Sequence, residues 1–391
     1  MKRVLILGAG VYQVPLIKKS REMGIYTIVS SIPGNYPGFS NADKVFYENT
    51  VDLDAILRVA REEKVDAIFT TGTDVAVTTI GYVCEELGLC GITYESALCV
   101  TNKARMKQHF LEGGVRTAEF CKVSSFEEAK AACRQISMPV IFKSVDMSGS
   151  RGIIRVDNED EIENAFRYSL TSTHCDYILV EKFLEGYEIG VDGYVSEDDW
   201  FIVPHDKILH SNGATNVPVG HAFPFECSSS LRKDIEEQIK KALYALGLKK
   251  AFFNADVMIC GDRSYIIEIG ARCGATCIPE LISIHYGIDY YEKMILNALG
   301  ETVDFPRNPV CASIGEILRS DRGGLITDIS VGPISKQVDE IVFDYSVGDT
   351  IRAFNVGPDR IGHVIAHGAN VSEAREVLED AKKAIKVLVK D

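Results

Sequence analysis

The chain has 391 residues, of which 46% are hydrophobic and 25% charged, as expected of a globular protein with two or three domains. It carries 42 Lys and Arg against 56 Asp and Glu, a net charge of −14. This balance argues against broad binding to nucleic acid or to an anionic membrane, because both need a basic surface. No apolar run reaches the roughly 20 residues that span a bilayer, and the chain starts directly with a strand pattern. We therefore expect a cytoplasmic protein whose 11 cysteines, which lack zinc-site spacing, are free thiols.

The first hundred residues alternate apolar strands with helical segments, a pattern that predicts a parallel sheet of βαβ units. The expected strands are 4–7, 25–30, 67–70 and 91–92, and the expected helices are 14–23, 52–63 and 78–87. The glycine turn at 8–10 is similar to the start of a dinucleotide site, but Gln13 stands where a third glycine is needed. The second strand also ends in Ser30-Ser31 and not in the acidic residue that binds ribose. We interpret the turn as a strand-to-helix connection in a Rossmann-like domain, which leaves an NAD-dependent oxidoreductase as the weakest alternative.

The pattern after residue 100 predicts mixed α+β structure. Helices are expected at 102–112, 126–136, 158–169 and 231–246, and strands at 139–143, 178–183, 188–195, 200–203, 252–259 and 264–271. Residues 204–229 are expected to be irregular. After Pro306 we expect a small strand-rich domain that closes with a helix over 372–387.

A candidate phosphate site follows the strand 139–143. Lys143 ends this strand just before the small-residue loop 148–152, and such a loop can direct backbone donors at a polyphosphate. Lys103 and Lys107 lie one turn apart on the helix 102–112, which by itself is more typical of a solvated basic face. The strand 178–183 carries Glu181 near its end, where a carboxylate and backbone groups either bind an adenine and ribose or face solvent.

The hairpin over 252–271 holds a pair of carboxylates. With a three-residue loop at 261–263, Cys260 pairs with Ser264 and Asp256 lies opposite Glu268. The polar face then carries Asn254, Asp256, Glu268, Gly270 and Arg272, and the core face carries Phe253, Ala255, Val257, Ile259, Tyr265, Ile267 and Ile269. Two opposed carboxylates repel unless a divalent cation such as Mg²⁺ lies between them. The alternative is a shifted register that places the two acids on different faces.

In this order along the chain, these features resemble the ATP-grasp superfamily of carboxylate–amine and carboxylate–thiol ligases. The resemblance implies two ATP lysines, an adenine-binding segment with an acidic strand position after it, two metal ligands and a catalytic pair made of Glu268 and Arg272. The two ATP lysines are Lys103 and Lys143. The adenine-binding segment is Glu181, Lys182, Phe183 and Leu184, and the acidic strand position after it is Glu188. The two metal ligands are Asp256 and Glu268. It also implies a phosphate lid made of Ser148, Gly149, Ser150 and Gly152. Gly270 departs from the pattern, because the superfamily usually has there an Asn that is a third metal ligand.

The runs 268–272 and 220–224 look like those of L-amino-acid ligases, which implies that His221 and Arg272 contact substrate. The implied architecture is α/β, with a Rossmann-like pre-ATP-grasp domain, a two-part ATP-grasp domain and a small C-terminal α+β domain. The expected ranges are 1–100, 101–305 (a lid at 115–187 and a central part at 188–305) and 306–391. The implied ligands are ATP, Mg²⁺ or Mn²⁺, and a small carboxylate and an amine bound by segments 204–225, 273–290 and 315–365, in a chain that forms a homodimer.

The resemblance implies that ATP converts the carboxylate to an acylphosphate, which the amine then attacks, with release of ADP and phosphate. Two alternatives remain: a bicarbonate-activating carboxylase of the biotin carboxylase type, and a nucleotide-binding regulatory protein without turnover.

Overall fold

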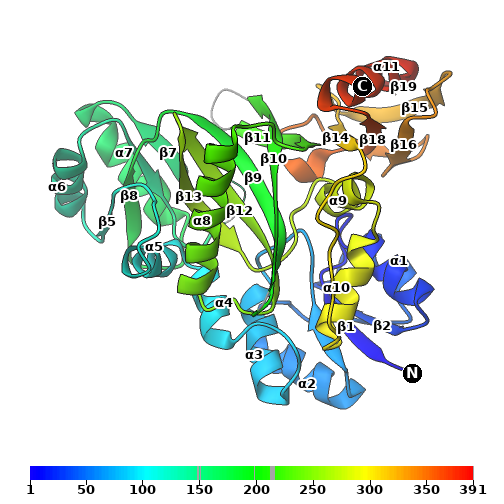
Figure 1. Cartoon of the computed structure of the whole chain (residues 1–391), viewed down its shortest axis with the longest axis horizontal. Helices are drawn as coiled ribbons and strands as arrows, with labels where there is room; N and C mark the ends of the chain where they lie inside the picture. The colour runs from blue at the N-terminus through cyan, green and yellow to red at the C-terminus, as the bar shows by residue number, and fades with distance from the viewer. Residues whose placement is uncertain (148, 150, 198, 212–215, 391) are drawn as a thin grey trace.

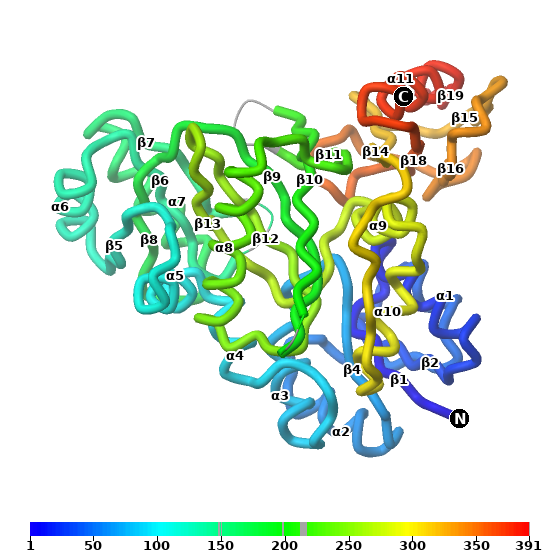
Figure 2. Tube along the Cα trace, in the orientation of Figure 1, coloured from blue at the N-terminus to red at the C-terminus, as the bar shows by residue number. Residues whose placement is uncertain are grey.

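A computed structural model describes residues 1–147, 149, 151–197, 199–211 and 216–390. Figure 1 shows an N-terminal domain at the lower right, a lid at the far left, a large central sheet between them and a C-terminal region at the upper right. The trace in Figure 2 places helix α5 (Lys103–Glu112) at the side of the lid that faces the central sheet. In the described part of the chain, no helix is both long and apolar enough to cross a membrane.

The N-terminal domain is built on a four-stranded parallel sheet of order β3-β2-β1-β4, which confirms the expected βαβ units. Its strands are β1 (Arg3–Leu7), β2 (Tyr26–Ser30), β3 (Lys44–Phe46) and β4 (Ala67–Phe69). Its helices are α1 (Val14–Glu22), α2 (Leu53–Glu63), α3 (Val77–Leu87) and α4 (Tyr94–Val100), and a 3-10 turn spans Phe39–Asn41. The strand expected at 91–92 is wrong. These residues lie in the turn between α3 and α4, where a β-carbon at Gly91 would meet Cys84 Sγ at 2.5 Å and Thr93 caps α4.

The lid is an antiparallel sheet of order β5-β8-β6-β7, with two helices packed on it around one apolar core. Its strands are β5 (Phe120–Val123), β6 (Val140–Lys143), β7 (Ile153–Val156) and β8 (Ile178–Lys182). Its helices are α6 (Phe126–Ile136) and α7 (Ile162–Thr171), the latter preceded by a 3-10 turn at Glu159–Glu161. The expected helix 126–136 is confirmed, with the Ser125 hydroxyl accepting from the Glu128 amide.

The central sheet has eight strands in the order β13-β12-β9-β10-β11-β14-β18-β16. They are β9 (Tyr187–Val195), β10 (Trp200–Ser211), β11 (Asn216–Phe223), β12 (Ala251–Cys260), β13 (Arg263–Gly270), β14 (Ala312–Leu318), β16 (Val338–Phe343) and β18 (Gly362–Gly368). Helix α8 (Ser229–Ala245) covers the apolar face of β9, β12 and β13. Helices α9 (Ile278–Tyr286) and α10 (Tyr290–Ala298) follow the hairpin.

The irregular segment expected at 204–229 is wrong, because β10 and β11 occupy most of its described part. The polar side chains that obscure the strand pattern, including His205 and Lys207, have partners on the same sheet face. Strand β14 pairs with β11, so the central sheet continues past residue 306.

A separate three-stranded sheet, β17-β15-β19, completes the C-terminal region. It contains β15 (Gly324–Val331), β17 (Thr350–Ile351) and β19 (Ile385–Lys390), while a 3-10 turn spans Gly357–Asp359 and helix α11 spans Val371–Ala384. The helix expected at 372–387 therefore ends too late. From Ile385 onward aliphatic residues alternate with polar or exposed ones, and this stretch pairs with β15.

The hairpin β12–β13 confirms the predicted pairing of Asp256 with Glu268. Between this pair and the loop, however, the register is shifted by one residue from the predicted one, because a bulge interrupts the pairing. The loop is one residue shorter than expected, because Cys260 pairs with Arg263, and a bulge near Ile267 restores the offset. Tyr265 and Ile267 were expected on the core face, and this is wrong. Ile266 is buried in the core in their place, because the short loop shifts residues 263–266 by one position.

Candidate functional site

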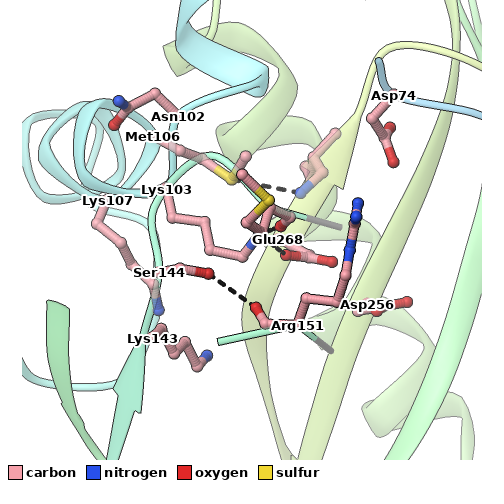
Figure 3. A network of polar contacts seen from close by, with 12 residues as sticks. Asp74, Asn102, Lys103, Met106, Lys107, Lys143, Ser144, Arg151, Asp256 and Glu268 are labelled. Carbon is pink, nitrogen blue, oxygen red and sulfur yellow. Dashed lines mark hydrogen bonds and ion pairs between the residues drawn. The ribbon is translucent and has the colours of Figure 1, made fainter. Parts of the chain in front are cut away.

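The predicted ATP and metal residues gather where the lid faces the polar side of the central sheet. Figure 3 shows Lys103 and Lys107 from α5, Lys143 from β6, and Glu268 and Asp256 from the hairpin around one cleft. Four groups of contacts build this site.

The first group, here called the lid cluster, consists of Lys107, Lys143 and Glu181. The Glu181 Oε2 atom accepts from both amino groups, at 3.1 Å from Lys107 Nζ and 3.0 Å from Lys143 Nζ. Burial would raise the pKa of Glu181, but the two lysines outweigh it and lower that pKa. Two lysines and one carboxylate leave a net charge of +1, which suits an anionic ligand.

Lys107 was expected on a solvated face, and this is wrong. Its side chain is 2% exposed and donates to Thr117 Oγ1 at 2.6 Å. Burial lowers the pKa of Lys107 to about 8, against the opposing pull of Glu181. Lys107 follows the buried Met106 and lies one helical turn before the buried Phe110, so it belongs to the apolar face of α5. This position on the helix could have predicted its burial.

Lys103 joins the lid side to the hairpin. Its Nζ lies 3.0 Å from Glu268 Oε2 and donates to the carbonyl of Met147 at 2.8 Å, while its backbone N–H donates to the carbonyl of Val145. Burial would raise the pKa of Glu268, but Lys103 and the nearby lysines lower it to about 2. The loop after β6 is therefore held next to the hairpin carboxylate.

The hairpin cluster consists of Lys207, Glu188 and Asp256. Lys207 Nζ lies 2.5 Å from a carboxylate oxygen of each acid, and its side chain is 5% exposed. Burial raises the pKa of Asp256 to about 6, and the nearby Glu188 and Glu268 add to this against the opposing effect of Lys207. One lysine and two carboxylates leave a net charge of −1. Sequence reasoning missed Lys207 because its segment was expected to be irregular.

Arg272 connects the hairpin to the N-terminal domain. Its guanidinium bonds to Asp74 Oδ2 at 2.7 Å through Nη2, and to Asn254 Oδ1 at 2.9 Å through Nη1. Asn254 in turn donates to the fully buried Asp192, which also pairs with His205 Nε2 at 3.0 Å. Sequence reasoning did not identify Asp74, because it lies 198 positions from its partner in the N-terminal domain.

His221, expected to contact substrate, lies on β11 with its side chain buried against His205, 4.8 Å between ring centroids. Burial lowers its pKa well below the ordinary value. It therefore sits beside the Asp192–His205 pair within the sheet.

The predicted adenine segment begins at the end of β8, at the edge of the lid. The backbone N–H groups of Lys182 and Phe183 bond to the carbonyls of Glu119 and Pro139, and the amino group of Lys182 donates to the carbonyl of Ser137 at 2.9 Å. Arg155 lies over the ring of Phe183 at 4.1 Å, and Leu184 is half-buried.

In the predicted phosphate lid, Gly152 has φ +70° and its carbonyl accepts from the Ser144 amide at 2.9 Å. A β-carbon there would meet Ser144 Oγ at 2.5 Å, so the turn requires glycine. Gly149 is exposed in the same loop. Ser148 and Ser150 lie outside the described residues.

The hairpin acids fit a hard divalent cation in donor type. Asp256 and Glu268 are directly paired, their side chains are 24% and 37% exposed, and both face the cleft that holds Lys103. Carboxylate oxygens in a partly open site are the donors that Mg²⁺ takes together with substrate phosphates.

A separate cavity of about 400 Å³ lies between the N-terminal domain, the start of α9 and the C-terminal strands. Charged residues on its wall include Lys18, Glu280, Glu340 and Arg360. The Glu280 Oε2 atom is buried without a hydrogen-bond partner in the described part of the chain, and burial raises the pKa of Glu280. The cavity draws on segments 273–290 and 315–365, two of the three expected to bind substrate.

Comparison with known proteins matches two domain families. Residues 136–280 match the ATP-grasp domain, and residues 317–390 match the L-amino acid ligase C-terminal domain 2. The alanine–anticapsin ligase of Bacillus subtilis is 26% identical over 281 residues, which cover 65% of this chain and 58% of that protein. The chain thus spans less than two thirds of that relative's length.

Two solved structures share the whole fold. The phosphoribosylglycinamide synthetase of Anaerococcus prevotii superposes with a TM-score of 0.86 at 29% identity, over 100% of both chains. The L-amino acid ligase of Bacillus licheniformis gives 0.82 at 18% identity, over 100% of this chain and 99% of that one. The chain therefore has the ATP-grasp fold, and residues 317–390 are similar to the L-amino acid ligase C-terminal domain 2.

Proposed function

We propose that the chain is an ATP-dependent ligase that joins a small carboxylate to an amine through an acylphosphate, releasing ADP and phosphate. The observation that carries this proposal is that the Asp256–Glu268 pair lines the same cleft as Lys103 and Lys143, with Lys103 Nζ 3.0 Å from Glu268 Oε2. Such a cleft presents a metal-binding face and a phosphate-binding face to the same polyphosphate.

In this proposal Lys103 and Lys143 bind the phosphates of ATP, and Glu181 holds Lys143 in place. Glu181 then acts through the lysines, since its Oε2 is already shared by two amino groups. Asp256 and Glu268 would hold Mg²⁺, which neutralises charge on the β- and γ-phosphates. The adenine would lie against the backbone and side chains of residues 182–184.

The reaction balances without a side-chain nucleophile. A carboxylate oxygen of the substrate attacks the γ-phosphorus, and the bond to the β-phosphate oxygen breaks to give ADP. The amine nitrogen then attacks the acyl carbon, phosphate leaves, and the nitrogen loses one proton. Arg272 stands beside the hairpin, where its guanidinium would stabilise the acylphosphate oxygens.

The substrate class that fits best is an amino acid, bound in the cavity beside α9. The buried Glu280 Oε2 offers an acceptor for an ammonium group, and Lys18 lies on the same wall for a carboxylate. Arg360 is already held by Asp344 through two bonds of 2.6 and 3.0 Å, so it would mainly shape the wall. The name of the alanine–anticapsin ligase of Bacillus subtilis, a relative of this chain, supports an amino acid as substrate.

The test is phosphate release by the purified chain with ATP, Mg²⁺ and a panel of amino acids and small carboxylates offered in pairs. Hydroxylamine in place of the amine should trap a hydroxamate when the correct acid is present. AMP and pyrophosphate as products would overturn the proposal.

Two other results would favour the alternatives. Bicarbonate-dependent ADP formation without a hydroxamate would indicate a carboxylase. Tight nucleotide binding without turnover on any pair would indicate a regulatory protein.

A further inference from the structure

Three side chains of the kinds that bind transition metals meet where α4 contacts α5. The ligand atoms of Glu95, Cys99 and His109 all lie within 4.8 Å of one another. Glu95 and Cys99 are one helical turn apart on α4, so both point to the same face of that helix, and His109 comes from α5. Residues 101–102 join the two helices, and this short turn brings the carboxylate, the thiol and the imidazole together.

The spacing of sulfur and oxygen in this group fits a tetrahedral metal ion. Cys99 Sγ donates its proton to Glu95 Oε1 at 3.6 Å. With bonds of about 2.3 Å to sulfur and about 2.1 Å to oxygen, a tetrahedral Zn²⁺ holds these two atoms about 3.6 Å apart. A zinc ion can therefore replace the shared proton with little movement of either atom. The imidazole nitrogen needs to come to about 3.5 Å from both atoms, which a small rotation of the half-buried His109 ring provides.

The ligands also differ in burial in a way that suits a bound ion. Cys99 is 2% exposed and belongs to the same apolar cluster as Met106 and Phe110, so its sulfur is held in place before any ion binds. The Glu95 side chain is 70% exposed, which leaves an open side for entry of the ion and for a water ligand. Within the described residues the ring nitrogens of His109 have no hydrogen-bond partner that would compete for them.

One positive charge opposes a cation here. Arg105 Nη1 lies 3.9 Å from Glu95 Oε1, and the Arg105 side chain is 51% exposed. An exposed ion pair of this kind contributes little free energy, so the guanidinium can turn into solvent when an ion binds. The donor set also differs from that of the nucleotide cleft. A thiolate, an imidazole and a carboxylate suit Zn²⁺, whereas a pair of carboxylates suits Mg²⁺.

We propose that Glu95, Cys99 and His109 bind a zinc ion, with water as the fourth ligand, and that this ion ties α4 to α5. The thiol proton of Cys99 leaves to solvent when the ion binds. His109 lies two residues after Lys107, about 200° around α5, so the ion sits on the side of the helix away from the phosphate lysines. The inference therefore does not depend on the proposed function.

The experiment titrates the purified full chain with Co²⁺ alone, without nucleotide, because a cobalt–thiolate bond gives a charge-transfer absorption band that oxygen ligands do not give. The wild type should show this band, and Zn²⁺ should remove it by taking the same site. Cys99→Ser should lose the band, and His109→Ala should weaken Co²⁺ binding by at least about 10-fold, the lower limit for lost metal-site support. Cys90→Ser is the matched control, since this half-buried thiol lies outside the group and its loss should leave the band intact.

Arg105→Gln separates a metal ligand from a surface ion pair. If Glu95 is a ligand, removal of the opposing charge should tighten Co²⁺ binding by up to about five-fold, the range for an exposed charge pair. Unchanged affinity would remove Glu95 from the ligand set and overturn the three-residue site. Zn²⁺ should also raise the melting temperature of the wild type but not that of Cys99→Ser, because an ion bound only to the folded state stabilises it. Melts without metal verify that each variant is folded.

Three further results would overturn the inference. The first is a wild type without the charge-transfer band. The second is a band of equal strength in Cys99→Ser, which would mean that Co²⁺ binds at other cysteines. The third is a loss of Co²⁺ binding in Asp256→Asn as large as that in Cys99→Ser, which would place the ion in the nucleotide cleft. Failure of the ligase assay alone would overturn the proposed function and leave this site intact.

Discussion

The lid cluster and the hairpin cluster use the same two residue types in opposite proportion. In the lid cluster one carboxylate, Glu181, lies between two lysines, and in the hairpin cluster one lysine, Lys207, lies between two carboxylates. Each minority residue is at least 95% buried and contacts both of its neighbours, but the two lysines of the lid cluster are nearly as buried as Glu181, whereas the two acids of the hairpin cluster are 30% and 24% exposed. In each cluster the central residue holds its two partners in place, and the partners set the sign of the net charge.

The hairpin carboxylates, Asp256 of the hairpin cluster and Glu268 paired with it, should be the more sensitive to a change of charge. Glu268→Gln should lower the rate of ADP formation by about 10²–10³-fold, the range for removal of one charge-stabilising group. Glu268 would hold the metal and also positions Lys103 at 3.0 Å. Initial rates against Mg²⁺ concentration measure the loss, and Asp256→Asn should show the same defect.

Glu237→Gln is the matched control, since this acid lies on α8 with Lys241 as its partner. A normal Mg²⁺ response in both hairpin variants would show that the carboxylate pair is structural.

Removing a charge from the lid cluster should lower the affinity of the protein for nucleotide. Lys143→Met should weaken ATP binding by about 10–150-fold, because a charge-assisted contact worth about 1.5–3 kcal/mol is lost. Lys130→Met on α6 is the control, with the same change of charge in the same lid but with Glu127 as its partner. Calorimetric titration with ATP measures both, and equal dissociation constants would remove Lys143 from the phosphate site.

Lys207→Met tests whether the central residue of the hairpin cluster sets its geometry. The variant should melt several degrees lower, because removing one partner of a mostly buried group leaves Glu188 and Asp256 unpaired. Mg²⁺ should recover more of this loss than it adds to the wild type, since a cation replaces the missing charge. Lys207→Arg keeps the charge and should stay near the wild type. Identical melting of all three proteins would contradict a geometric role.

The fold was largely predictable from local patterns, while the contacts of the site were predictable only in part. The N-terminal βαβ units, α6 and the Asp256–Glu268 pairing follow from periodicity and turn length. The pairing was correct although two errors of one residue cancelled, a shorter loop and an unseen bulge. Bulges leave no periodic signal, which is why the core role of Ile266 was missed.

Long-range contacts explain the other omissions. Lys207 reaches Asp256 across 49 positions and Asp74 reaches Arg272 across 198, and no spacing rule joins such residues. Lys107 was missed for a different reason. A lysine beside apolar positions of a helix is ordinarily solvated. The burial of Lys107 depends on its ion pair with Glu181, which lies on strand β8 and not on the helix of Lys107.

A further expected effect is a dependence of stability on pH that belongs to Lys107. Its pKa is about 8 in the folded protein and ordinarily 10.5, because burial disfavours the charged form. Between these values the unfolded chain binds more protons than the folded one, so this lysine adds stability as pH rises from about 8 to 10.5. Below pH 8 both states are protonated, and the contribution of Lys107 to stability is constant and unfavourable.

Between pH 8 and 10.5 the free energy of unfolding of the wild type should therefore rise relative to that of Lys107→Met by at most about 1.4 kcal/mol per pH unit. Urea unfolding at pH 7, 8, 9 and 10 measures the difference, with Lys107→Arg as a control that keeps its charge throughout. A wild type that instead loses stability relative to Lys107→Met above pH 8 would mean that the ion pair with Glu181 outweighs burial, and the two clusters would then differ less than their geometry implies.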